Sequence, residues 1–513
     1  MDEQDNKPKA EMREKTVVSR RSFVASVAAA GAGITIAPRH VLGRGSTPPS
    51  DTVNIAIVGI GGMGSSNTRA VASQNIVAIC DVDWSYADKA IERLKDTPEE
   101  SSARRGGPPP SEEERARRAE EARRLGQMIP KAKRYQDYRQ MLEKQKDIDG
   151  LIIATPDHMH APIASAAMDL GKHVYVQKPL CWSVHEARHL AKMATEKKVI
   201  TQMGNQGHSR DDARKGVEYI MAGAIGEVRE VHVWTNRPLG YWPQGVPRPA
   251  PLSVPADTLR WNGDDVNRRF AAALAGNYPK PNGLAWDLFL GVSPSVDYHP
   301  IYHPFNWRGW VAWGQGALGD MGAHLIDHPF WSLDLGYPTS VETIATPFNH
   351  FCYPNATTVY YQFPARGSMP PVKLTWYDGG LMPPKPEELG EEKVNPGGGI
   401  LYVGSKGKMM QDTYGDNPRL IPKSFNESYG TPPEKLPRIP TSHEMNWVDS
   451  IKGKTKPSSP FEYSSRLTEV MLLGIVSLHA AGKIYYDGAN MRVTNNARAN
   501  DFLTREYREG WGL

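Results

Sequence analysis

Five residues just after the first strongly apolar stretch could together hold an anionic ligand. Residues 53–58 are almost all apolar and predict a buried strand, and residues 59–64 follow with the pattern G-x-G-x-x-G. Glycines permit a tight turn and close approach of the backbone to a pyrophosphate, whose charge the start of a helix stabilises. We therefore expect phosphate groups at this bend, with the candidate contacts Gly59, Gly61, Gly62, Met63 and Gly64.

A carboxylate at the end of the next apolar run indicates the rest of that ligand. Residues 76–80 predict a second strand, which ends at Asp81, 22 positions after Gly59. An acidic side chain at this point accepts hydrogen bonds from the adenosine ribose and repels a 2′-phosphate. The pattern therefore predicts a dinucleotide, NAD rather than NADP. Asp83 is a second candidate for the ribose contact.

Strand and helix patterns continue to alternate up to residue 203. Apolar runs at 151–154, 173–177 and 199–203 are separated by helical spacing at 161–170 and 184–197. Repeated units of this length predict a parallel, doubly wound sheet of the Rossmann type. Ligands bind such sheets beyond the carboxyl ends of the strands. The loops there contain Thr155, Pro156, Asp157, His158, His160, Gln177 and Lys178.

A charged segment, residues 97–133, interrupts this alternation. It holds a Pro- and Gly-rich patch and then acidic and basic residues at helical spacing over 112–124. Such interleaving is typical of a solvated helix with ion pairs along it. We interpret the segment as an insertion, and an interaction arm is the alternative.

Several segments together match the pattern of one family. They are the glycine bend with Asp81, Thr155-Pro156 with His160, residues 171–179, residues 225–228, residues 319–324 and residues 463–487. With these pieces the chain resembles the Gfo/Idh/MocA family of NAD(P)-dependent sugar and polyol oxidoreductases over about residues 53–487. The resemblance implies a second, α+β domain with a large open, mostly antiparallel sheet, and strand patterns at 228–235, 357–363, 372–377 and 400–403 permit one.

The resemblance also implies roles for single residues. His324 is the expected general base, Asp320 orients it or binds substrate, and Lys178 bridges the cofactor ribose and a substrate hydroxyl. From the residues alone, Asp320 and His324 are four positions apart and would share a helix face, which is also common for a surface pair. The family usually has Glu before the lysine, where this chain has Gln177. The further cofactor contacts that the family implies are Thr155, Pro156, His160 and Gln177.

An aromatic segment, residues 298–313, offers substrate contacts. Ring faces can cover the apolar face of a sugar while amide and guanidinium groups meet its hydroxyls. Trp307 and Arg308 are the candidates, and core packing is the alternative for many of these rings. The histidines near 158–160 and at 299 and 303 could bind a metal, but Pro300 and Pro304 keep the latter pair off a helix. We expect no metal site.

Composition excludes several classes of protein. The 513 residues carry 61 Lys+Arg against 57 Asp+Glu, and residues 1–50 hold eight basic and five acidic groups. The remainder is nearly neutral, which disfavours nucleic-acid binding. Three cysteines are too few for a disulfide framework, and no apolar run reaches the ~18 residues of a membrane span.

The first residues read as an export signal. Arg20 and Arg21 precede a weakly apolar stretch at 23–37, a pattern typical of Tat export to the periplasm. A short buried helix is the alternative. We divide the chain into a signal and linker (1–50), an NAD-binding domain (51–204), a substrate and oligomerisation domain (205–487) and a tail (488–513).

Export would bring the cofactor along with the folded protein, so we expect NAD to stay bound. Three functions remain open: a sugar, polyol or glycoside oxidoreductase, a redox-neutral NAD-dependent glycoside hydrolase or lyase, and a non-catalytic sugar-binding relative. The expected partner is a small carbohydrate or glycoside. The open sheet of the second domain favours a homo-oligomer.

Overall fold

The computed structural model describes residues 51–96 and 111–513, and Val53–Leu513 form one compact unit. The expected export signal, residues 1–50, and the first part of the insertion, residues 97–110, lie outside the described residues. Among the helices that are described, none combines the length and apolar character needed to cross a membrane.

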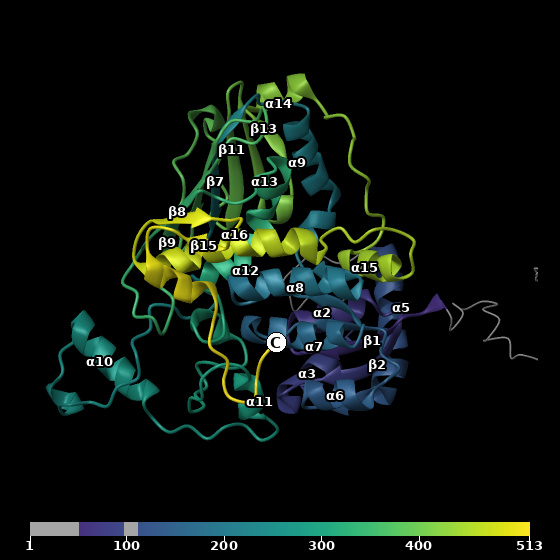
Figure 1. Cartoon of the computed structure of the whole chain (residues 1–513), viewed down its shortest axis with the longest axis vertical. Coiled ribbons are helices and arrows are strands. Elements are labelled where there is room, and N and C mark those ends of the chain that lie inside the picture. The colour runs from purple at the N-terminus through teal and green to yellow at the C-terminus, as the bar shows by residue number, and fades with distance from the viewer. Residues whose placement is uncertain (1–50, 97–110) are drawn as a thin grey trace, which may run out of the picture. The chain divides into compact units, whose positions relative to one another are not determined.

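A six-stranded parallel sheet confirms the predicted Rossmann-type half of the fold (Figure 1). Its order is β3-β2-β1-β4-β5-β6. The chain adds β2 and β3 on one side of β1 and then β4, β5 and β6 on the other side, so the strand order switches between β1 and β4. All of its strand pairs are parallel, and every residue of β4 is buried. The strands are β1 (Asn54–Val58), β2 (Asn75–Cys80), β3 (Lys133–Tyr135), β4 (Gly150–Ile153), β5 (His173–Val176) and β6 (Thr201–Met203).

Helices follow the strands as the sequence pattern predicts. Their bounds are α2 (Met63–Ala70), α3 (Trp84–Arg93), α5 (Glu112–Met128), α6 (Tyr138–Lys144), α7 (His160–Asp169) and α8 (Val184–Lys197). The solvated helix of the insertion is confirmed as α5, which Ser111 caps and along which Glu120 pairs with Arg123 and Arg124. Helix α8 begins with a capping box of Ser183 and Glu186.

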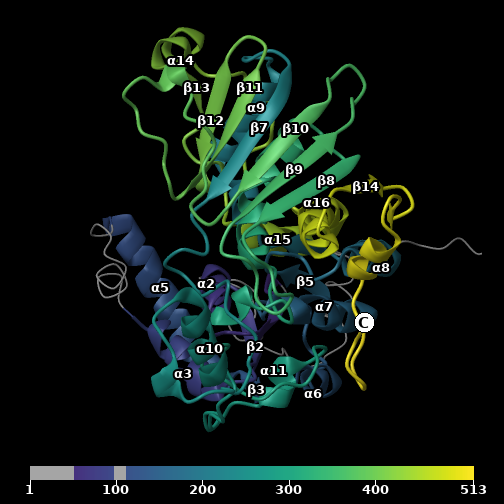
Figure 2. The ribbon, with the colours of Figure 1, turned by 90° about the vertical axis from the view of Figure 1, so that its left-hand side faces the viewer.

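A nine-stranded sheet forms the other half of the unit (Figure 2). Its order is β13-β12-β11-β7-β10-β9-β8-β14-β15, and only β7 and β10 pair in parallel, which confirms the mostly antiparallel sheet. The strands are β7 (Val228–Thr235), β8 (Ser340–Ala345), β9 (Thr357–Phe363), β10 (Val372–Tyr377), β11 (Gly398–Gly404), β12 (Lys408–Asp412), β13 (Arg419–Ile421), β14 (Ile484–Asp487) and β15 (Arg492–Val493).

Helix α16 (Phe461–Ala480) joins the two halves. It contacts β8 of the larger sheet, and also α8 and β6 of the Rossmann half. Figures 1 and 2 both show it running between the two sheets. Both halves contact this helix, so its packing does not mark where one domain ends. The domain boundaries given above stay a prediction.

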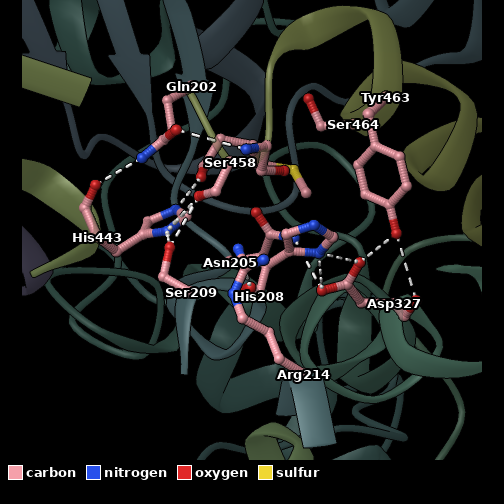
Figure 3. A network of polar contacts seen from close by, with 12 residues as sticks. Gln202, Asn205, His208, Ser209, Arg214, Asp327, His443, Ser458, Tyr463 and Ser464 are labelled. Carbon is pink, nitrogen blue, oxygen red and sulfur yellow. Dashed lines mark hydrogen bonds and ion pairs between the residues drawn. The ribbon is translucent and has the colours of Figure 1, made fainter. Parts of the chain in front are cut away.

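A buried polar network fixes the start of α13 (Asp327–Ser332) against neighbouring elements (Figure 3). The Asp327 carboxylate accepts from Asn205 Nδ2 at 3.1 Å and from the Tyr463 hydroxyl at 2.5 Å. His208 Nδ1 lies 3.0 Å from both carboxylate oxygens. Burial would raise the pKa of Asp327, but His208 and the hydrogen bonds outweigh it and hold the pKa at about 2.

The same network continues through His443 at the start of α15 (His443–Ile451). Its Nε2 donates to the carbonyl of Met203 at 2.7 Å, and burial lowers the pKa of His443 to about 4. The ring is therefore neutral, and its Nδ1 accepts from the Ser209 hydroxyl at 2.6 Å. This histidine ties α15 to the end of β6.

Candidate active site

A cavity of about 480 Å³ lies beyond the carboxyl ends of β1, β2, β4 and β5. Its opposite wall comes from α12 (Gly316–Leu325), the turn η6 (Asn306–Gly309) and the turn η8 (Thr413–Gly415). Of the residues selected from sequence, the structure brings to this cavity Gly59, Gly61, Gly62, Met63, Asp81, Thr155, Pro156, Gln177, Lys178, Trp307, Arg308, Asp320 and His324. Gly64 and His160 do not line it.

The glycine bend has the shape that a pyrophosphate requires. Gly59 has φ 82°, and a Cβ there would lie 2.7 Å from the carbonyl oxygen of Ala154. A Cβ on Gly64 would collide with the carbonyl of Gly59, so this glycine allows α2 to pack on the bend. Gly62 has open space around its Cβ position, and no side chain caps the start of α2. Backbone amides at the start of α2 can therefore approach an anion.

The Asp81 carboxylate is positioned to accept hydrogen bonds from hydroxyl groups. The amides of Ile60 and Asp83 donate to its two carboxylate oxygens at 2.9 and 3.0 Å. Each oxygen keeps a further lone pair for a ligand. Burial raises the pKa of Asp81 to about 6.

Asp83, the alternative ribose contact, is engaged elsewhere. Its carboxylate caps α3 by accepting from the amides of Ser85 and Tyr86, and it pairs with His303 Nε2 at 2.8 Å. Asp83 does not line the cavity, whereas Asp81 does. The geometry therefore favours Asp81.

Lys178 and Asp320 meet in the middle of the cavity wall. Lys178 Nζ donates to Oδ1 of Asp320 at 2.9 Å and to its backbone carbonyl at 2.7 Å. Arg308 Nε lies 3.2 Å from the same Oδ1, and Arg237 Nε lies 3.8 Å from Oδ2. Burial would raise the pKa of Asp320, but Lys178 and Arg308 hold it well below its usual value. Asp320 thus supplies the carboxylate beside the lysine that Gln177 does not.

His324 stands one turn along α12 from Asp320. Burial and the nearby Lys178 lower its pKa well below the ordinary value, so the ring is neutral. Its Nδ1 has no hydrogen-bond partner among the described residues, and no hydrogen bond to the Asp320 carboxylate is found there. Tyr414, in the left-handed region with φ 67°, contacts the ring edge-on at 4.7 Å between centroids.

The loop after β4 contributes a carboxylic acid and a brace. Asp157 lines the cavity, and burial raises its pKa to about 8 against the opposing effects of Arg308 and Lys178. His160 lies behind the wall, with ring nitrogens 2.7 Å from the carbonyl of Pro179 and 2.8 Å from that of Thr155. His160 therefore braces the two loops, and the structure shows it in contact with their backbone instead of the cavity.

Neither histidine pair from the sequence forms a metal site here. His158 Nε2 lies 2.9 Å from the carbonyl of Phe289, and His303 pairs with Asp83. Across the part of the chain that the structure describes, no group of three or more potential metal ligands is found. Cys80, Cys181 and Cys352 are buried and free.

Several cavity residues were missed by sequence reasoning. Arg237 and Trp242 belong to the Pro- and Gly-rich loop after β7, and Tyr414 to the turn after β12. Trp511 reaches the cavity from the C-terminal segment. Their only sequence signal was an aromatic or basic residue within a loop, which is too common to select a site.

Comparisons with known proteins agree with the fold. Residues 111–205 match the family model described as "Oxidoreductase family, NAD-binding Rossmann fold", that of Gfo/Idh/MocA. An NAD-binding protein from Listeria innocua and the WlbA dehydrogenase from Bordetella pertussis, solved with NADH and UDP-GlcNAcA, each superpose with a TM-score of 0.50. They are 15% and 14% identical and cover 85% of this chain, and 97% and 99% of their own chains. These two likenesses show the shared fold.

Curated relatives match a shorter stretch. A glycosyl hydrolase family 109 protein from Shewanella pealeana is 28% identical over 189 residues, 35% of this chain and 34% of the relative. An alpha-N-acetylgalactosaminidase from Shewanella oneidensis is 24% identical over 235 residues, 41% of this chain and 44% of the relative. The chain thus spans less than half the length of these relatives. The resemblance to the Gfo/Idh/MocA oxidoreductases is confirmed, and the chain carries that family's NAD-binding Rossmann fold.

Proposed function

We propose that this chain is an NAD-dependent oxidoreductase that acts at a hydroxyl-bearing carbon of a sugar, polyol or glycoside and keeps its NAD bound. One observation carries the proposal: Lys178, Asp320 and His324 line the same cavity as the glycine bend. A dinucleotide on the bend and a hydroxyl beside Lys178 would share this cavity.

The chain's own residues would hold NAD along the strand ends. The bend at Gly61 and Gly62 would receive the pyrophosphate, and Asp81 the adenosine ribose. Lys178 would contact the second ribose, on the side of the cavity that faces α12. When bound there, NAD supplies a hydride acceptor.

His324 and Lys178 would handle the substrate hydroxyl. A neutral imidazole can accept the hydroxyl proton, and burial keeps His324 in that neutral form. Lys178 would donate to the same oxygen and offset the negative charge that develops on it. Asp320 positions Lys178 through two hydrogen bonds from Nζ, one to its carboxylate and one to its backbone carbonyl.

The C-terminal segment supports the idea that NAD is retained. Trp511 lines the cavity together with Tyr138 and Asp81, and Arg139 lies over the Trp511 ring at 4.2 Å. Arg508 anchors the segment because it donates to the backbone carbonyls of Gly291 and Asp287 at 2.9 Å. A ligand at the Asp81 end would therefore be partly covered.

A second candidate is redox-neutral cleavage of a glycoside. The curated relatives carry glycoside hydrolase names, and Asp157 is a carboxylic acid in the cavity that stays mostly protonated at neutral pH. A protonated acid can donate to the oxygen of a leaving group. A non-catalytic sugar-binding relative is the third candidate.

The test uses protein purified without added NAD. We expect NAD in the supernatant after denaturation, and turnover of a sugar or a chromogenic glycoside that Lys178→Met abolishes and Lys192→Met, at an exposed lysine of α8, does not. Aglycone release without net NADH would select the glycosidase. An empty protein, or full activity in Lys178→Met, would overturn the proposal.

We further propose Tat export to the periplasm and assembly into a homo-oligomer. The first rests on Arg20 and Arg21, and is tested by the location of the tagged protein after replacement of both by Lys. The second rests on the open nine-stranded sheet, and is tested by the mass of the purified protein in light scattering.

A further inference from the structure

The wall of the cavity around Asp320 carries more positive than negative charge. Three cations line it, Lys178, Arg237 and Arg308, with side chains that are 12%, 18% and 19% exposed. All three converge on one carboxylate, that of Asp320, which is 12% exposed. Partly buried charges are costly unless they are paired, so an excess of this kind indicates a missing anion.

The other titratable groups of this wall do not supply the missing charge. Asp157 is the one further carboxyl group that the lining residues bring near Arg308 and Lys178, and burial keeps it mostly protonated at neutral pH. His324 is neutral, and burial raises the pKa of the Tyr414 hydroxyl above its ordinary value. The wall therefore carries three positive charges against one negative charge.

Both arginines keep donors available. Arg237 Nη1 donates to Asn236 Oδ1 at 2.8 Å, and Arg308 Nη1 to the carbonyl of Phe305 at 3.0 Å. Within residues 51–96 and 111–513, neither Nη2 has a hydrogen-bond partner. A planar guanidinium with free N–H groups matches a carboxylate.

Aromatic rings hold these two guanidinium groups in place and flank the ligand space. Arg237 lies over the Tyr241 ring at 3.3 Å, and Arg308 over the Trp307 ring at 4.2 Å. Trp242 lines the same wall. Flat apolar rings beside fixed polar groups suit the alternating faces of a sugar ring.

We propose that this wall binds a sugar that carries a carboxylate group, such as a uronic acid or its glycoside, through Arg237 and Arg308. The inference rests on the proposed function and names its substrate class. Asp320 and the sugar carboxylate then balance two of the three cations. Lys178 keeps one positive charge for the hydroxyl oxygen that reacts.

Calorimetric titration of the NAD-loaded protein tests this proposal without turnover. The probes are D-glucuronate and D-galacturonate against D-glucose and D-galactose, with D-glucose 6-phosphate as the other anion. We expect each uronate to bind at least tenfold more tightly than its parent sugar, and the advantage to shrink at high salt. Equal affinity for acid and parent sugar, or a preference for the phosphate, would overturn it.

Variants assign the preference to the wall. Arg237→Met should remove most of the advantage of the uronate, whereas Arg229→Met, at an exposed arginine of β7, should leave it intact. Equal loss of acid and neutral sugar binding in Arg237→Met would contradict the assignment. If Arg237→Met does not fold, Arg237→Lys is the deciding variant. It keeps the positive charge but loses the planar guanidinium, so we expect a partial loss of the uronate preference. An unchanged preference in Arg237→Lys would count against the proposal.

NAD content is measured on the same samples. A protein that contains no NAD contradicts the proposed function, whichever sugar it binds. A protein that contains NAD but binds both sugars equally contradicts only the carboxylate proposal.

Discussion

Two aspartates on consecutive helices, Asp320 on α12 and Asp327 on α13, have lowered pKa values for different reasons. Asp327 is surrounded by one histidine and two neutral donors, and its side chain is 1% exposed. Asp320 is surrounded by three cations and lines the cavity.

This difference separates a structural carboxylate from one at a binding site. The groups around Asp327 direct their hydrogen bonds to its carboxylate. The network joins α13, α15 and α16 (Figure 3). Around Asp320 positive charge and guanidinium donors remain for a ligand. A low carboxyl pKa alone therefore does not mark a site, but an excess of partners beside a cavity does.

Replacement of Lys178 should give the largest effect in the cavity. We expect Lys178→Met to lower kcat/KM about 10³-fold, about 4 kcal/mol, because it removes the donor to the reacting oxygen. The free energy of unfolding should change by less than about 1 kcal/mol, because Arg308 and Arg237 still pair with the Asp320 carboxylate. Kinetics and urea unfolding measure the two quantities. A large loss of stability with an unchanged kcat/KM would show that Lys178 has a structural role like that of Asp327.

Removal of Asp327 should show the opposite pattern. Asp327→Ala leaves His208, Asn205 and Tyr463 without their shared acceptor, and we expect a loss of about 3 kcal/mol in the free energy of unfolding. Asp320→Ala should cost less than half of that, because water can reach its partners. Urea unfolding of both variants compares the two sites directly, and equal losses would contradict the distinction.

Acid should weaken the Asp327 network in a defined range of pH. The native pKa of about 2 lies below the ordinary 3.8, so the stabilisation is complete above pH 4 and is lost as the pH falls toward 2. It amounts to about 2 kcal/mol. The stability difference between wild type and Asp327→Asn should shrink by that amount between pH 5 and pH 2. A constant difference would show that Asp327 is not held ionised.

The smallest effect is expected at the rim of the cavity. Trp511→Ala should speed the release of NAD about tenfold, because an aromatic ring over a base contributes about 1 to 3 kcal/mol. The free energy of unfolding should fall by no more than about 1 kcal/mol, because the ring contacts Arg139. Tyr485→Ala, at an exposed ring of β14, is the control. Stopped-flow dilution of loaded protein into excess competitor measures the rate. An unchanged rate of NAD release would show that the C-terminal segment does not retain NAD.

Sequence reasoning selected the cavity residues that are local in the chain. The glycine bend and Asp81 follow from strand, turn and spacing within about 30 residues, and the α12 pair followed from the resemblance. The Rossmann strands were predicted because they are continuous apolar runs. β3 was missed because it has three residues, two of them exposed, at the end of the charged insertion.

The rest depends on contacts that the sequence pattern does not encode. Arg237 meets Asp320 across 83 positions of the chain, and the carboxylate that replaces the missing Glu beside Lys178 comes from another element. The pairing of Asp83 with His303 likewise joins distant loops. The raised pKa of Asp157 follows from its burial in the folded chain, which the sequence pattern does not show.

One measurement tests the central claim most directly: the absorbance of reduced nicotinamide after a sugar acid is mixed with protein purified without added cofactor. The account predicts a rise toward about one equivalent per subunit in the wild type, and a rise about 10³-fold slower in Lys178→Met that still releases NAD on denaturation. A rise at equal rate in both proteins, or none in a wild type that contains NAD and binds the sugar, would contradict it.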